Sequence, residues 1–322
     1  MATLHPTAAP PLTAAPAASA QPGGGLCMSL ELAWGRLRRA CLRRLRPAYV
    51  RRMAGLRQGH CPGCPHDVVD PRDLKFVRNV CGFRFRPEDD PFAWRGRLGL
   101  ARYGLAEVVC FSLLFLGGAV LAGALAVAVH PAFWAPFALV LAVWALVLSF
   151  FRDPERTIPA DADLLVSPAD GTVTHAGEVS DPDFPGGRAF TVSIFLSVFN
   201  VHVNRVPRAG RVLRLAYYPG RFLDARHGDC AVRNEQFQVD LEDGRTGGLV
   251  RVKQVAGAVA RRIVCWLRPG EELRAGERFG MIKFGSRTEV SVPAELVEAV
   301  LVKPGDTVKG GSTPLLRLRE RP

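Results

Sequence analysis

Ser286 is the residue whose setting in the chain first suggests covalent chemistry. It follows Gly285 in the segment GERFGMIKFGSRTEV, residues 276–290. A serine hydroxyl attacks a carbonyl only when a base takes its proton. A glycine has no Cβ, so the backbone at Gly285 can adopt a strained conformation and be approached closely. Read alone, the Gly285–Ser286 pair is equally well a simple turn between two strands.

One kind of serine chemistry has little support in this segment. A serine hydrolase carries its nucleophile on a strand–turn–helix elbow such as GxSxG. The residues after Ser286 read as a strand and not as a helix. The local context of a hydrolase is therefore missing.

A second reactive group is the segment HCPGCPH at residues 60–66, with Cys81 further along the chain. Cys61 and Cys64 have the spacing of one half of a zinc knuckle, and His60, His66 and Cys81 could complete four ligands. The second CxxC of a zinc ribbon is missing. We therefore assign no metal, and a zinc knuckle and a turn with incidental cysteines both stay open.

Two long apolar segments indicate that the chain is attached to a membrane, so we expect any site that it forms to lie near that membrane. Residues 108–129 and 132–151 contain no charged residue, and His130 and Pro131 separate them. Each run has about the 20 residues that cross the hydrocarbon core of a bilayer. Arginines precede the first run and follow the second, and the connecting turn has no Lys or Arg. The pattern predicts a transmembrane helical hairpin over 105–151 with both ends in the cytoplasm.

The part of the chain after the hairpin reads as strands. Its apolar runs are short and rich in β-branched residues, with turn signals such as PADG at 168–171 and PGD at 304–306 between them. This spacing predicts a mostly β (α+β) domain over residues 152–322, sandwich-like or barrel-like, with few helices. It follows the hairpin directly, so we expect its working face to lie close to the bilayer.

The part before the hairpin is basic. Residues 1–107 hold 17 Lys or Arg against 8 Asp or Glu. Such a block beside apolar spans favours contact with anionic lipids, and because no nucleic-acid motif accompanies it we expect no nucleic-acid partner. Residues 1–27 are rich in Ala and Pro and are predicted to be disordered, with Met28 as an alternative start. Residues 28–104 form a basic extension in which 28–58 is predicted to be a helix, and the eight scattered cysteines indicate a reducing compartment.

An ordered set of motifs links these parts to a known family. FFRDPER stands at 150–156, SPADG at 167–171, SIFLSVFNVHVNRVP at 193–207, NEQ at 234–236 and QVAGAVARRI at 254–263, followed by the Gly285–Ser286 segment. In this order they closely resemble the short phosphatidylserine decarboxylases of bacteria and the related archaetidylserine decarboxylases. The resemblance covers residues 150 to about 316 and the preceding apolar pair, and it makes residues 1–95 an unusual extension.

The resemblance implies a self-made cofactor. In the family, the hydroxyl of the residue at the Ser286 position attacks the preceding carbonyl and turns the amide into an ester. Elimination then releases the Gly285 carboxylate, and the remaining dehydroalanine loses ammonia to water and becomes a pyruvoyl group. That ketone takes the electron-sink role that pyridoxal phosphate, which the family does not use, plays elsewhere. The implied products are chains of residues 1–285 and 286–322 that stay together.

The same resemblance suggests the helpers of Ser286. His202 in NVHVNR is the candidate base, and Asp170 in SPADG is a candidate to orient it. Longer relatives carry a second histidine three residues after the first, where this chain has Arg205. The step that His202 serves, self-cleavage or decarboxylation, therefore stays open. Arg205, Arg261 and Arg262 are either ligands of the lipid phosphate or substrate carboxylate, or solvated charges.

Taken together, the sequence predicts a decarboxylase of phosphatidylserine in the inner membrane, with its β domain on the cytoplasmic side and membrane lipids as partners. Archaetidylserine is an alternative substrate. The other alternative is a non-catalytic, membrane-tethered β carrier or binding domain, because PGDTVKGG at 304–311 is similar to a hairpin of biotin and lipoyl carriers. The oligomeric state, including a homo-oligomer, stays open.

Overall fold

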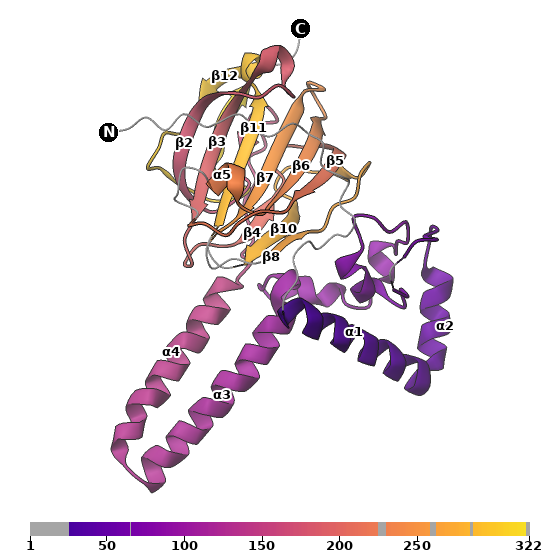
Figure 1. Cartoon of the computed structure of the whole chain (residues 1–322), viewed down its shortest axis with the longest axis vertical. Coiled ribbons are helices and arrows are strands. Elements are labelled where there is room, and N and C mark those ends of the chain that lie inside the picture. The colour runs from indigo at the N-terminus through magenta and orange to yellow at the C-terminus, as the bar shows by residue number, and fades with distance from the viewer. Residues whose placement is uncertain (1–25, 65, 225–229, 258–261, 284–285, 320–322) are drawn as a thin grey trace.

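The computed structural model describes residues 26–64, 66–224, 230–257, 262–283 and 286–319. It consists of a β domain, a long helical hairpin and an N-terminal extension beside them (Figure 1). The prediction of a mostly β domain after the hairpin is confirmed, since the chain beyond residue 163 is built almost entirely from strands.

The main element of the β domain is an eight-stranded antiparallel sheet that curls into a half-barrel. Its strands lie in the order β13-β2-β3-β11-β7-β6-β5-β9. Their bounds in that order are Thr307–Val308, Gly171–Ser180, Arg188–Leu196, Ser286–Pro293, Leu249–Ala256, Gln236–Asp243, Gly210–Tyr218 and Glu272–Leu273. Strand β11 therefore runs through the middle of the sheet, between β3 and β7.

Two smaller sheets complete the β domain. One has the order β4-β10-β8, from strands Val203–Arg205, Arg278–Lys283 and Arg262–Cys265, and the other has the order β1-β14-β12, from strands Leu164–Val166, Pro314–Leu318 and Val297–Val300. Gly280 shows how tightly β10 is held, because a Cβ there would lie 2.3 Å from the Val264 carbonyl oxygen. Alternating apolar side chains of the large sheet, such as Val192, Ile194, Val252 and Val290, fill the core.

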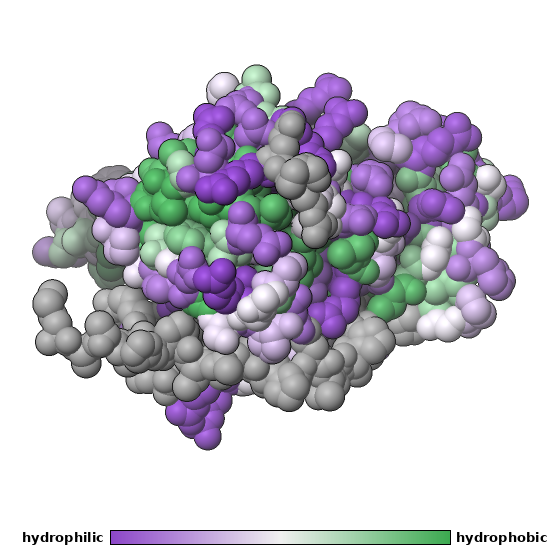
Figure 2. All heavy atoms as spheres, turned by 90° about the horizontal axis from the view of Figure 1, so that it is seen from above, coloured by the Kyte–Doolittle hydropathy of each residue, from purple (hydrophilic) through white to green (hydrophobic). Residues whose placement is uncertain are grey.

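The helical hairpin consists of α3, Leu105–Ala128, and α4, Trp134–Phe150. Both are long and apolar enough to cross a membrane, and most of their side chains are exposed, as Leu113 at 72% and Val127 at 80% illustrate. Exposed apolar helices of this length indicate association with a membrane. The opposite end of the molecule, in the view of Figure 2, mixes hydrophobic areas with many hydrophilic side chains.

The hairpin is anchored where the small sheet β4-β10-β8 begins. Phe150 and Phe151 at the end of α4 pack in one buried cluster with Val203, Val264 and Met281, one residue from each strand of that sheet. Figure 1 shows the hairpin extending from this side of the β domain. The anchoring fixes the distance between the small sheet and the apolar helices.

The extension corrects two predictions. A single helix was predicted over residues 28–58, but the structure has α1, Leu26–Leu45, and α2, Pro47–Leu56. Pro47 explains the break, since proline has no N–H for the helix and disfavours helical geometry in the residue before it. Residues 26 and 27 belong to α1 and not to a disordered segment, and residues 1–25 lie outside the described residues.

The remaining elements are short. One α-helical turn, α5, spans Cys230–Arg233. The 3-10 helices η1 to η7 are Pro71–Phe76, Pro87–Asp89, Ala93–Arg97, Arg102–Gly104, Pro131–Phe133, Pro185–Gly187 and Ala294–Leu296.

Candidate active site

Ser286 is the first residue of β11 and is fully buried, with Leu196 of β3 on one side and Ala256 of β7 on the other. Its Oγ has no hydrogen-bond partner among the described residues. A buried hydroxyl left without a partner costs about 1–3 kcal/mol, so natural structures rarely keep one without a use. The oxygen is thus shielded from water and uncommitted. Gly285 lies outside the described residues.

We call the face of β11 that points into the core with Val290 and Val292 the inner face. Polar side chains are hydrogen-bonded on this face next to Ser286. Because side chains alternate along a strand, Ser286 and Thr288 point to the same face. The Asn204 side chain of β4 donates to the Thr288 hydroxyl at 3.2 Å and accepts from the Gln254 side chain of β7 at 2.8 Å. These bonds tie the small sheet β4-β10-β8 to the large sheet at Thr288, two residues along β11 from Ser286.

His202 lies just before β4 and is also fully buried. Its Nδ1 lies 2.9 Å from the Asn200 carbonyl oxygen, and its ring packs against that of Phe150 at 4.3 Å between centroids, with the two planes tilted by 36°. A carbonyl can only accept, so Nδ1 carries the proton and Nε2 is left with its lone pair. Burial lowers the pKa of His202 to about 4. Its Nε2 has no partner among the described residues, and a neutral imidazole of this kind can act as a base.

The fold brings His202 close to the chain that leads into Ser286. The Ile282 backbone N–H on β10 donates to the His202 carbonyl oxygen at 3.3 Å. Strand β10 ends one residue later, at Lys283, and β11 begins at Ser286. His202 therefore lies beside the end of the strand that precedes Ser286 in the chain.

Asp170 has different partners from those expected. Its carboxylate pairs with the Arg156 guanidinium at 2.7 Å and accepts from the Gly310 backbone N–H at 2.8 Å. No hydrogen bond joins Asp170 to His202 among the described residues, and the imidazole is oriented by the Asn200 carbonyl instead. To orient His202, the Asp170 carboxylate would have to leave its pair with Arg156.

Two of the three arginines considered as lipid ligands are held in ion pairs. Arg205 is 4% exposed and binds Asp153 at 2.8 Å, and Arg262 binds Glu31 of α1 at 2.5 Å. Neither fits the alternative of a solvated charge. Arg261 lies outside the described residues.

Lys283 is a charged residue near the site that the sequence reasoning missed. It is 4% exposed and forms an ion pair with Glu107 at the start of α3, and burial lowers its pKa to about 8. Arg262 also faces Glu107, at 4.0 Å. The pair ties the end of β10 to the base of the hairpin. A lysine after the apolar run FGMI, two residues before Gly285, was the available signal.

Glu235 is the second missed residue, although the motif NEQ had drawn attention to its segment. Its carbonyl oxygen accepts from the Ala256 N–H at 2.9 Å, so it lies one strand beyond Ala256, which itself faces Ser286. The side chain is 4% exposed and its Oε1 has no partner among the described residues. Burial raises the pKa of Glu235 to about 7, and a hydrogen bond with Tyr217 partly opposes the shift. The raised pKa of this carboxyl follows from its burial in the fold, which the sequence alone does not show.

Comparison with known proteins identifies what this arrangement resembles. A family model described as phosphatidylserine decarboxylase matches residues 143–315. A protein of Rhodopirellula baltica named "Phosphatidylserine decarboxylase proenzyme" is 43% identical over 249 residues, which are 77% of this chain and 100% of that relative. Proteins of the same name from Symbiobacterium thermophilum and Trichlorobacter lovleyi are 49% and 46% identical over 63% and 64% of this chain, and 92% and 89% of their own lengths.

Proposed function

The chain belongs to the phosphatidylserine decarboxylase family, and we propose from this premise that it converts phosphatidylserine to phosphatidylethanolamine with a pyruvoyl group made from its own Ser286. The single observation that carries the proposal is the fully buried Ser286 hydroxyl, which no described residue binds, at the start of a central strand.

In the proposed maturation, the Ser286 hydroxyl attacks the Gly285 carbonyl carbon and the peptide bond becomes an ester. His202 accepts the hydroxyl proton at Nε2, the nitrogen that has a lone pair and no partner among the described residues. Elimination then cleaves the ester, and hydrolysis with loss of ammonia leaves a pyruvoyl group at position 286. The proposal retains Asp170 as a helper, with the condition that its carboxylate exchanges Arg156 for His202.

The bonds around β11 explain how two chains would stay together. Strand β11 pairs along its length with β3 and for six residues with β7, both of which precede the cut in the sequence. Strand β14 pairs with β1, and β13 pairs with β2. The described part of the small chain, residues 286–319, is thus bound on several sides by segments that precede it in the chain.

The pyruvoyl group would supply a ketone that withdraws electrons while the serine headgroup loses CO₂. The surroundings of position 286 suit such a group. Leu196 and Ala256 flank it, and the buried position excludes water, which strengthens every electrostatic interaction there.

The hairpin supports a membrane location for this chemistry. Phe150 of α4 touches the ring of His202, so the site lies at the base of two helices that are apolar and exposed. A lipid headgroup could reach such a site without leaving the bilayer. Because Arg97, Arg102 and Arg152 flank the hairpin and its turn has no Lys or Arg, we propose the inner membrane with the β domain on the cytoplasmic side.

The test is conversion of phosphatidylserine in mixed micelles by the purified full-length protein. We expect ethanolamine lipid as the product and two bands on a denaturing gel. Ser286→Ala should give one uncut band of 35.0 kDa and no product. Ser291→Ala, which alters another buried serine of β11, is the matched control and should be cut normally.

An uncut wild-type chain without activity would favour a non-catalytic tethered β domain. Faster turnover of archaetidylserine than of phosphatidylserine would reassign the substrate and leave the maturation intact.

A further inference from the structure

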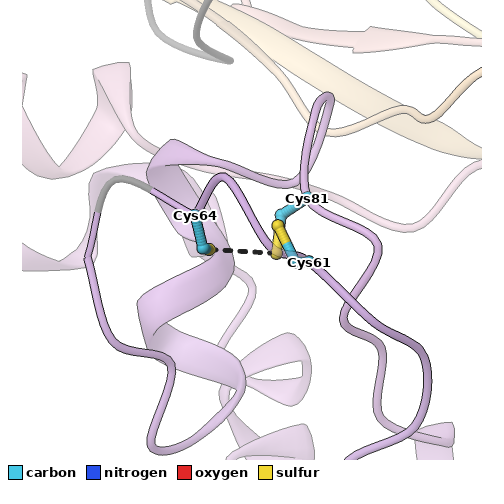
Figure 3. Close-up of side chains that lie close together, drawn as sticks. All are labelled: Cys61, Cys64 and Cys81. Atoms are coloured by element: carbon cyan, nitrogen blue, oxygen red, sulfur yellow. Dashed lines mark hydrogen bonds between the residues drawn. The ribbon is translucent and has the colours of Figure 1, made fainter.

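Three cysteine side chains of the extension converge on one point. The sulfurs of Cys61, Cys64 and Cys81 all lie within 4.8 Å of one another, and those of Cys64 and Cys81 are 3.3 Å apart. Figure 3 shows the three side chains pointing toward a common centre, two from the turn at 61–64 and one from a separate segment. This cluster belongs to the extension and plays no part in the proposed decarboxylation.

The backbone around the cluster is built for this close approach. Gln58 and Arg84 exchange backbone hydrogen bonds of 2.8 and 2.9 Å. Gly59 has a φ of 83°, and a Cβ there would lie 2.1 Å from the Gly82 carbonyl oxygen. A Cβ at Gly82 would likewise lie 2.1 Å from the His60 carbonyl oxygen. Only glycine fits at these two positions, and their pairing brings Cys61 beside Cys81.

Three sulfurs in one cluster match a metal better than a disulfide. A disulfide joins two sulfurs about 2.05 Å apart and leaves the third one over. Three thiolates that each bind one zinc ion at about 2.3 Å lie about 3.8 Å from each other in a tetrahedron. The sulfur–sulfur distances in the cluster, all within 4.8 Å, are compatible with this spacing. Cys81 is 3% exposed, and Cys61 and Cys64 are half-buried, so the centre is partly shielded from water.

The loop at residues 78–83, which follows the 3-10 helix η1, docks on the β domain. Arg78 donates to the Trp266 carbonyl oxygen at 2.7 Å and pairs with Glu271 at 2.6 Å. Asn79 donates to the Leu267 carbonyl oxygen. In the opposite direction, Arg268 of the β domain donates to the carbonyl oxygens of Arg78 and Phe83. The docked loop thus runs from residue 78 to residue 83 and contains Cys81.

The apolar core of the extension is small. Its own buried apolar cluster consists of Val68, Leu74, Val77 and Cys81, with a few partly buried neighbours. A core this small seldom fixes a fold alone, and small modules commonly add a metal or a disulfide. A positive group is also at hand, because Arg268 donates to the Phe83 carbonyl oxygen of this loop and would offset the charge of thiolates at the cluster.

We propose that Cys61, Cys64 and Cys81 bind one zinc ion as thiolates, and that this ion fixes the 78–83 loop in the shape that docks on the β domain. The ion is structural and lies outside the reaction. A fourth ligand completes the tetrahedron.

The test is the metal content of the full-length protein, purified in detergent without chelator and measured by plasma mass spectrometry. We expect one zinc ion per chain, and less than about a tenth of that in the Cys61→Ser, Cys64→Ser and Cys81→Ser variants. Cys41→Ser is the matched control, because Cys41 is an exposed cysteine of α1 and should leave the zinc content unchanged.

A second measurement uses only the wild-type chain, in case the variants fail to fold. Alkylation with iodoacetamide should label Cys41 quickly and the three cluster cysteines slowly, and a zinc chelator should remove that protection. Wild-type protein that stays metal-free after incubation with Zn²⁺ would overturn the proposal. A native disulfide between Cys64 and Cys81, or zinc retained by a variant lacking all three thiols, would overturn it equally.

Discussion

The two faces of strand β11 carry buried polar side chains in different states. On the outer face the side chains are bonded to each other, and one nitrogen, Arg287 Nε, has no partner among the described residues. Arg287 pairs with Glu289 at 2.8 Å, Ser193 of β3 donates to Glu289 at 3.0 Å, and the hydroxyls of Ser291 and Thr191 lie 2.7 Å apart. On the inner face, the Oγ of the first residue has no partner among the described residues. One strand therefore contains both a polar network that stabilises the fold and a polar atom that does not.

This contrast indicates that the fold separates stability from reactivity. A satisfied buried network rigidifies a protein, whereas an unsatisfied buried polar group costs free energy of folding. The inner side gathers four such atoms from different elements, namely Ser286 Oγ, His202 Nε2, Glu235 Oε1 and Gln254 Oε1. We expect substitutions on the inner side to cost reaction rate and to spare stability, and substitutions on the outer face to do the reverse.

The largest effect is expected for His202→Gln. Loss of a positioned base lowers rates by roughly 10²–10⁴-fold, so self-cleavage of newly translated chain should slow by that factor while the folded state persists. A time course of cut and uncut bands after cell-free synthesis measures it. His175→Gln, at a histidine of β2, is the control and should cut at the wild-type rate. Rapid cutting of the His202 variant would remove His202 from the maturation.

The pH profile of the same cleavage gives an independent check on His202. Burial lowers its pKa to about 4, so the base stays neutral well below the ordinary histidine range. The cleavage rate should therefore fall only as the pH approaches 4. A fall centred near pH 6.5 would show that the base is a solvated histidine.

Glu235→Gln should stabilise the protein at high pH. Because burial raises the pKa of Glu235 from 4.5 to about 7, the folded state holds a proton that the unfolded state has lost between these values. Wild-type stability thus falls as pH rises through this window, by up to about 3 kcal/mol. Thermal unfolding at several pH values should show the variant more stable above pH 7 and equal to wild type below pH 4.5. An equal difference at every pH would contradict the burial of a charge.

Glu289→Gln, on the outer face, should destabilise the fold by about 1–3 kcal/mol, because Arg287 loses its charged partner in a site that is largely buried. The same unfolding measurement applies. If the fraction of cut chain also collapsed while the protein stayed folded, the separation of the two faces would fail.

Ser291→Ala should have the smallest effect, a loss of about 1 kcal/mol from the bond to Thr191. Its comparison with Ser286→Ala is the sharpest form of the contrast, since both serines are buried in one strand. The first should lose stability and keep the cut, and the second should lose the cut and keep stability.

Much of this architecture could be predicted from local patterns. The uncharged runs predicted the helices α3 and α4, and the β-branched runs at 190–198, 211–217 and 248–255 predicted β3, β5 and β7. Strands β2 and β6 were missed because they contain polar or glycine-rich stretches, such as GTVTHAGEVS at 171–180, which form strands only when paired within the sheet.

The site divides in the same way. The two motifs that contain Ser286 and His202 could be found from the sequence. The ion pairs that the charged residues near them form could not. Asp170 binds Arg156, 14 residues away in the chain, and Lys283 binds Glu107, 176 residues away, and no local pattern predicts either pair. The state of Glu235 likewise follows from its burial and not from its motif.

Mass spectrometry of the segment 286–322, isolated from active protein, tests the central claim most directly. The account predicts a separate chain that begins with a pyruvoyl group, so that it lacks the ammonia of an N-terminal serine and is blocked to sequencing. An active protein whose chain is intact, or whose small chain begins with a serine bearing a free amine, would contradict it.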